Sequence, residues 1–169
     1  MRDDVLVAPP LAYGASGEHA GFAGTLSLGS EVLALAVIEL VRSADWATRV
    51  VLVNGHGGNA DGLRRGVRTL RGEGRSVDVW VPLIAGGDAH AGRTETSLML
   101  AIDPTVVRLD VAAAGATEPI AELLPVLREG GVRSVSANGV LGDPTGASAD
   151  EGQALLTTLI ASLLKVIDG

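Results

Sequence analysis

Short apolar segments alternate with helical patterns along this chain, and glycine, asparagine or proline ends each apolar segment. The apolar segments are residues 5–8, 49–53 and 77–83, and their β-branched side chains favour strands. Nearly continuous apolar strands that are separated by helices form parallel sheets with both faces covered. The alternation therefore predicts an α/β fold, specifically a three-layer α/β/α domain with a mainly parallel sheet.

Helical patterns fill most of the remaining chain. Apolar residues recur at helical spacing after Ser30, over residues 63–70, over residues 95–101 and over the segment that follows Ser148. At 169 residues the chain can bury a sizeable core, so we expect a single domain over residues 1–169. The first predicted strand begins almost at residue 1 with nothing before it to cover it, as though an earlier βα unit were missing.

Glycine and proline recur through residues 111–147, which predicts an irregular segment with room for a small hairpin.

Composition excludes several classes of protein. The chain has no cysteine, which excludes a thiol nucleophile, a cysteine zinc site and an iron–sulfur cluster. Its net charge of −7, without a basic run, argues against nucleic acid and anionic membranes as partners. Apolar runs are broken well before ~18 residues, and residues 5–8 are too short for a signal peptide. We therefore expect a cytoplasmic protein.

All three histidines, His19, His56 and His90, lie in glycine-rich loops. His56 follows the strand predicted over 49–53, and His90 follows the one over 77–83, so both are expected at the carboxyl edge of the sheet. Glu95 is expected in the first turn of the next helix. Imidazole and carboxylate at one edge suit a divalent metal. The alternatives are an exposed His56 in a tight turn capped by Asn59, and a Glu95 that only caps its helix.

The loop over residues 9–29 is long for a compact domain, and such loops are usually functional or disordered. It contains Tyr13 and Phe22, the only tyrosine and the only phenylalanine, so we interpret it as an ordered substrate loop. Residues 14–18 read Gly-Ala-Ser-Gly-Glu and lack the final glycine of the G-x-S-x-G elbow. A Ser-His-Asp hydrolase therefore has little support.

These loop motifs together carry a family resemblance that covers essentially the whole chain. They are Tyr13-Gly14, Glu18-His19, Phe22-Ala23-Gly24-Thr25-Leu26-Ser27-Leu28, Asn54-Gly55-His56-Gly57-Gly58-Asn59 and His90-Ala91-Gly92 with Glu95-Thr96-Ser97. With them the chain resembles the creatininase family of metal-dependent hydrolases. Residues 12–19 and 138–144 look most like its mycofactocin-system branch.

The resemblance implies a three-layer α/β/α fold, a two-metal site with zinc, iron or manganese, and a homo-oligomer, often a hexamer. In the mycofactocin-system branch it implies release of a C-terminal Val-Tyr dipeptide from a modified precursor peptide. Carried over by motif, His56 and Glu95 are metal ligands, and His90 and Glu95 are catalytic. The substrate-binding residues implied are Tyr13, Glu18, His19 and Asp88.

Two departures from the family pattern leave alternatives open. Creatininase itself has a glutamate where Gly58 stands, so that metal contact must come from elsewhere, and Glu95 is the natural candidate. The family's upstream Glu-x-His-Gly segment and the aspartate after it are absent, which leaves about two ligands where a two-metal site needs several. The alternative functions are hydrolysis of a small cyclic amide such as creatinine, and a non-catalytic subunit or remnant.

Overall fold

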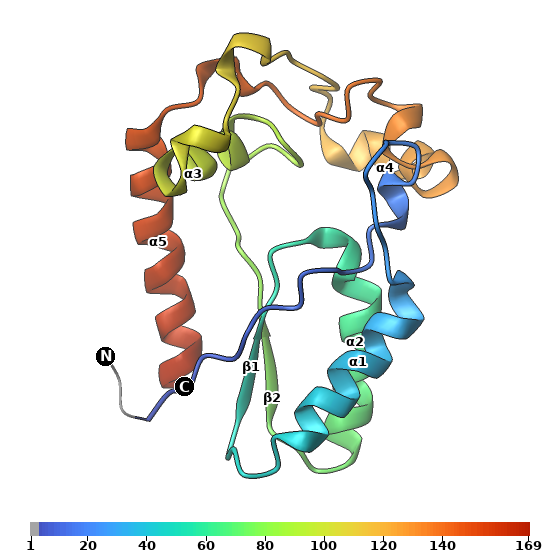
Figure 1. Ribbon diagram of the computed structural model, residues 1–169, viewed down its shortest axis with the longest axis vertical. Coiled ribbons are helices and arrows are strands. Elements are labelled where there is room, and N and C mark those ends of the chain that lie inside the picture. The colour runs from blue at the N-terminus through green and yellow to red at the C-terminus, as the bar shows by residue number, and fades with distance from the viewer. Residues whose placement is uncertain (1–3) are drawn as a thin grey trace.

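The computed structural model describes residues 4–169, which form five α-helices and two β-strands (Figure 1). Short 3-10 turns join them, among them η1 at Gly17–His19 and η2 at Gly57–Asn59. In chain order the main elements are α1 (Gly29–Ser43), β1 (Val50–Val53), α2 (Ala60–Gly72), β2 (Val77–Trp80), α3 (Arg93–Ile102), α4 (Ile120–Gly130) and α5 (Ala149–Asp168).

The two strands form a parallel pair at the centre of the fold. Val50 lies opposite Val77, and Val53 lies opposite Trp80. Helices α1 and α2 lie on one side of this pair, and α5 lies on the other (Figure 1). Helices on both sides of a parallel sheet confirm the predicted α/β/α arrangement.

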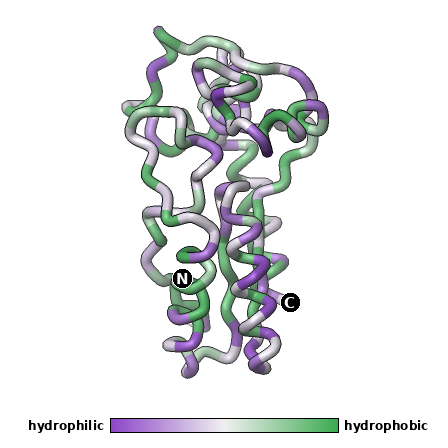
Figure 2. The backbone as a smooth tube through the Cα atoms, turned by 90° about the vertical axis from the view of Figure 1, so that its right-hand side faces the viewer, coloured by the Kyte–Doolittle hydropathy of each residue, from purple (hydrophilic) through white to green (hydrophobic). Residues whose placement is uncertain are grey.

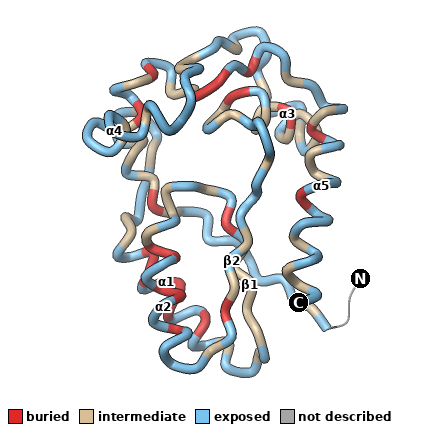
Figure 3. Tube along the Cα trace, turned by 180° about the vertical axis from the view of Figure 1, so that it is seen from behind, coloured by how far each residue is buried: buried red, intermediate tan, exposed pale blue. Residues whose placement is uncertain are grey.

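The core lies between α1, α2 and the strands. Its buried residues include Leu33 and Val37 of α1, Leu70 of α2 and Val77 of β2. Buried positions on the two helices face one another in Figure 3, and apolar and polar residues are interleaved along the helices in Figure 2. Within residues 4–169, no helix combines the length and the apolar character needed to span a bilayer.

Helix α5 is tied to the strands by side-chain hydrogen bonds. Arg49, just before β1, donates to the backbone oxygen of Val166 at 2.6 Å and to the carboxylate of Asp78 at 2.7 Å. The indole nitrogen of Trp80 donates to the hydroxyl of Ser162 at 2.9 Å. At its other end the helix begins as predicted, with the Ser148 side chain accepting from a backbone N–H in the first turn.

The strand predicted over residues 5–8 does not form. This segment has no strand assignment, and Leu6 and Val7 are 78% and 93% exposed. A strand is stabilised by the hydrogen bonds it makes with a neighbour. Within the described residues, β1 and β2 pair only with each other. Residues 5–8 therefore have no neighbouring strand with which to form these hydrogen bonds.

The segment over 111–147 is more helical than its sequence suggests. Helix α4 lies within it and contains Pro125. Proline inside a helix removes a backbone hydrogen bond, which is why this stretch does not read as helical. The predicted hairpin is also absent: Leu141 instead forms an isolated antiparallel bridge with His90.

Candidate functional site

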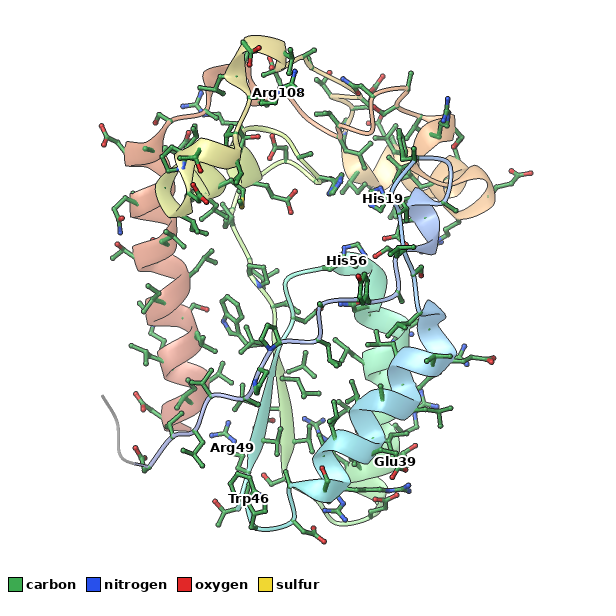
Figure 4. All side chains as sticks on the ribbon, viewed as in Figure 1. His19, Glu39, Trp46, Arg49, His56 and Arg108 are labelled. Atoms are coloured by element: carbon green, nitrogen blue, oxygen red, sulfur yellow. The ribbon has the colours of Figure 1, made fainter. Side chains whose placement is uncertain are left out.

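The structure brings the three histidines together. The ring centre of His19 lies 4.6 Å from that of His90 and 6.1 Å from that of His56. His56 follows β1, His90 lies beyond β2, and His19 is supplied by η1 in the long N-terminal loop. Figure 4 shows His19 and His56 close together beside the start of α2. The expected convergence of the His56 and His90 loops is therefore observed.

Asparagine side chains hold the His56 turn and the N-terminal loop together. Asn54 is buried and donates to the backbone oxygen of His56 at 2.9 Å. Asn59 donates to the side chain of Asn54 at 3.0 Å and accepts from the backbone N–H of Ala15 at 2.8 Å. Asn59 makes no side-chain capping bond to α2. Asn59 therefore stands at the predicted N-cap position of α2, but its side chain joins two loops instead of capping the helix.

Glu18 contributes the carboxylate next to His56. Its Oε1 lies 2.9 Å from Nε2 of His56 and 3.8 Å from Nε2 of His19. A Cβ at position 58 would overlap this carboxylate and the His56 ring. Gly58 therefore leaves room for Glu18, and the carboxylate paired with His56 is Glu18 rather than Glu95.

Glu95 instead pairs with His90. Nδ1 of His90 lies 3.4 Å from Oε2 of Glu95, which also accepts from the backbone N–H of Ala91 at 2.6 Å. Ala91 has a positive φ of 51°, which is uncommon for alanine. Glu95 is therefore bound to the turn before its helix as well as to the imidazole.

The surroundings of His90 and His19 shift the pKa values of these two residues in opposite directions. The Glu95 carboxylate raises the pKa of His90, and His90 in turn lowers the pKa of Glu95. Burial lowers the pKa of His19, and the neighbouring His90 lowers it further. The arrangement favours a protonated His90 beside a neutral His19.

These histidines line an open cavity of about 520 Å³. The structure also places in its wall residues that the sequence did not assign to the site, notably Ser16 and Asn138. The Ser16 hydroxyl lies 3.3 Å from Nε2 of His56. The lining residues are Ser16, His19, Phe22, Thr25, Leu26, His56, His90, Ala91, Asn138 and Gly139. The Asn138-Gly139 pair belongs to residues 138–144, which carried part of the family resemblance but were not assigned to the site.

Three of the four predicted substrate-binding residues, Tyr13, Glu18 and Asp88, do not line this cavity, whereas His19 does. Tyr13 is 54% exposed and does not line the cavity. Asp88 accepts hydrogen bonds from the backbone N–H groups of Arg93 and Thr94 at the start of α3. Glu18 lies beside the cavity through its contacts with His19 and His56.

The donor types in the cavity suit a divalent metal, but their arrangement does not form a two-metal centre. Among residues 4–169, no three His, Asp or Glu side chains are grouped so that they could hold an ion. The carboxylates are held in pairs with imidazoles, Glu18 with His56 and Glu95 with His90. A two-metal site requires several ligands for each ion. The described residues therefore do not fit such a centre on their own.

Comparison with curated proteins finds long matches. The mycofactocin precursor peptide peptidase of Mycobacterium ulcerans (strain Agy99) is 56% identical over 156 residues, which are 92% of this chain and 62% of that protein. The chain thus spans less than two thirds of that relative's length. The creatinine amidohydrolase of Pseudomonas putida is 30% identical over 200 residues, covering 98% of this chain and 75% of that protein.

Comparison with solved structures and with protein families agrees with these matches. The crystal structure of a creatinine amidohydrolase (creatininase) superposes with a TM-score of 0.71 and 27% identity, covering 94% of this chain and 73% of that one. The family model described as creatininase, creatinine amidohydrolase, matches residues 1–167. A match over nearly the whole chain settles the family: the chain belongs to the creatininase family.

Proposed function

We propose that this chain forms part of a metal-dependent peptide hydrolase that releases a C-terminal dipeptide, Val-Tyr, from a precursor peptide. The observation that carries the proposal is a cavity lined by three imidazoles from distant loops, two of which contact the carboxylates of Glu18 and Glu95. The Glu95–His90 pair has shifted pKa values, and such a pair in a concave site is typical of catalytic centres.

A peptide substrate is favoured over a small cyclic amide. Identity is 56% to the peptidase-named relative and 30% to the creatinine amidohydrolase. The cavity is open, and its volume of about 520 Å³ lies in the range that binds drug-sized ligands. Phe22 and Leu26 supply an apolar wall for side chains of a bound peptide.

His90 is proposed as the acid that protonates the leaving amine. Its pairing with Glu95 favours the imidazolium. When water adds to the amide carbonyl and the C–N bond breaks, the imidazolium has a proton to give to the leaving amine. Glu95 stays ionised and holds the ring through Nδ1. His19, kept neutral by burial, is available to accept a hydrogen bond from the substrate.

The metal of the whole enzyme is proposed to be zinc, iron or manganese. His56 and Glu95 are the ligands we assign to this chain, because imidazole and carboxylate are the donors these metals use. The remaining ligands are not among the groups that residues 4–169 bring together.

We also propose that the working form is a cytoplasmic homo-oligomer, a hexamer by family resemblance. Large apolar side chains that are more than half exposed support association, for example Leu83 at 81% and Ile102 at 62%. Native mass spectrometry gives the number of subunits, and a monomer at micromolar concentration would contradict this part of the proposal.

A substrate panel tests the proposed reaction. The purified protein is incubated with a precursor peptide ending in Val-Tyr and with creatinine, with zinc, iron(II) or manganese added in large excess so that even a weak metal site is filled. We expect mass spectrometry to detect the free dipeptide and no creatine. His90→Gln is expected to lower kcat by about 10²- to 10⁴-fold. Ser162→Ala, on α5 and outside the cavity wall, is the control.

Two other results of the substrate panel would support the alternative functions instead. Hydrolysis of creatinine alone would replace the peptide substrate by a cyclic amide. No turnover of either substrate with any metal would favour a non-catalytic subunit.

A further inference from the structure

The carboxylate of Asp88 is enclosed by the turn that carries His90 and by the start of α3. Its Oδ1 accepts from the backbone N–H of Thr94 at 3.0 Å, and its Oδ2 accepts from that of Arg93. The residue at the N-cap position of α3 is Gly92, which has no side chain to satisfy these amides. Asp88 therefore caps α3 from outside the helix.

Two glycines make room for this carboxylate. A Cβ at Gly92 or at Gly142 would overlap the Asp88 side chain. Gly142 also has a φ of 147°, which a residue with a side chain rarely adopts. The carboxylate thus lies between the start of α3 and the segment around residue 142.

Both elements next to Asp88 lead to the proposed catalytic pair. Leu141, which precedes Gly142, donates to the backbone oxygen of His90 at 2.8 Å and accepts from its N–H at 3.2 Å. Glu95 lies in the first turn of α3, the turn that Asp88 caps. The Asp88 carboxylate consequently fixes the start of α3, and with it Glu95, relative to the turn that presents His90.

We propose that Asp88 is a positioning residue that sets the geometry of His90 and Glu95 without contacting the substrate. Asp88 is absent from the cavity wall, and both of its oxygens are occupied by backbone amides. The proposal rests on the proposed function for its kinetic consequence. Its structural consequence is independent of any substrate.

The kinetic test compares Asp88→Ala, Asp88→Asn and Asp103→Ala in the active enzyme. Asp103 is a matched control because its carboxylate accepts from the Thr105 N–H at 3.0 Å at the opposite end of α3. We expect Asp88→Ala to lower kcat about 10- to 100-fold, the usual effect of losing an outer-shell partner, with KM changed less than about twofold. Asp88→Asn keeps one acceptor and should recover most of this loss. Asp103→Ala should stay within about twofold of the parent.

A second pair of variants tests the close approach of Gly92 to the Asp88 carboxylate. Gly92→Ala should displace Asp88 by overlap and lower kcat in the same way. In the double variant Asp88→Ala/Gly92→Ala the overlap is gone, so its loss should not exceed that of the worse single variant. Additive losses would contradict a shared mechanism.

A structural measurement separates this proposal from the proposed function. Hydrogen exchange followed by mass spectrometry should show faster exchange over residues 88–97 in Asp88→Ala, and the NMR signals of the His90 imidazole should shift. The Asp103→Ala protein should show neither effect. If the parent turns over no amide, the proposed function fails and these measurements alone decide the role of Asp88.

Two results would overturn the positioning role. One is a raised KM with unchanged kcat in Asp88→Ala, which would make Asp88 a substrate contact. The other is unaltered exchange and unaltered His90 signals in both Asp88→Ala and Asp88→Asn. Circular dichroism identifies a variant that fails to fold, and Asp88→Asn then carries the comparison.

Discussion

Position 58 shows how the absence of one side chain places another. A Cβ there would overlap the carboxylate of Glu18, the ring of His56 and the backbone oxygen of Ala15. The glycine thus lets a carboxylate from the N-terminal loop reach an imidazole beyond β1. The loop and the turn are held together by the same contact.

We expect Gly58→Ala to destabilise the protein by about 1–3 kcal/mol, the usual cost of overpacking a filled site. Gly57→Ala is the matched control, since a Cβ at Gly57 has no neighbour within 4 Å. Urea unfolding of the three proteins provides the measurement. Equal midpoints for the two variants would show that the Glu18–His56 contact is not tightly packed.

The sequence predicted the histidines of the site better than their partners. His56 and His90 each follow an apolar strand segment, and the ends of parallel strands share one edge, so their meeting could be foreseen. The partner of His56 depends on the path of a long loop, which has no periodic pattern. Nothing in the sequence indicates that Glu18, rather than Glu95, lies next to His56.

At the level of elements, α3 and α5 are joined by a small polar cluster. Ser97 is fully buried, donates to the carboxylate of Glu151 at 2.9 Å and accepts from the backbone N–H of Ser148 at 3.1 Å. Arg93 donates to the same carboxylate at 2.8 Å. A Cβ at Gly152 would overlap the backbone of Ser97, so the two helices approach closely.

This cluster makes stability depend on pH in a defined direction. Arg93 and then Ser97 lower the pKa of Glu151 below its ordinary value. A carboxylate with a lowered pKa in the folded state stabilises the protein above its unfolded-state pKa, and this contribution is lost as the pH falls through the folded-state value. We expect urea midpoints of the parent to fall more between pH 6 and pH 3 than those of Glu151→Gln. An exposed glutamate on α4, changed in Glu122→Gln, should leave the parent's pH dependence intact.

Arg49 is expected to anchor the end of α5. Its guanidinium joins the carboxylate of Asp78 to the last backbone carbonyls of the helix. Lysine has a single ammonium group and cannot donate to all of these acceptors as the planar guanidinium does. Arg49→Lys should therefore destabilise the protein by about 1–2 kcal/mol and speed hydrogen exchange over the last turn of α5. Arg65→Lys, at an exposed pair with Asp61 on α2, is the control. Equal exchange in the two variants would contradict an anchoring role.

Errors at the level of elements have local causes. The apolar pattern over residues 5–8 describes a strand that has no neighbour among the described residues. Helix α4 was not predicted because it contains Pro125, and a proline inside a helical pattern usually indicates that the helix ends or kinks there. The longer patterns of α1 and α2 were predicted because each of these helices buries an apolar face. Helix α5 was predicted from the spacing of its apolar residues, although only Gly152 and Leu159 are buried.

At the scale of the molecule, the cavity draws on segments from most of the chain. His19 and His56 come from the part that includes α1 and α2, whereas His90 and Asn138 come from the part between β2 and α5. The resulting site holds its acidic and basic groups in two separate pairs. A metal ion bound by His56 and Glu95 would compete with these contacts.

We therefore expect the chain alone to bind divalent metal weakly. After removal of loosely bound ions, elemental analysis should find less than one ion per chain. Excess zinc should stabilise the folded protein by less than about 1 kcal/mol, which corresponds to a rise in Tm of less than about 4 °C. Imidazole is a ligand that zinc prefers, so His56→Gln should reduce whatever zinc-induced shift in Tm the parent shows. One or two tightly held ions that are lost in both His56→Gln and Glu95→Gln would contradict this expectation. They would mean that the two pairs rearrange into a complete metal site.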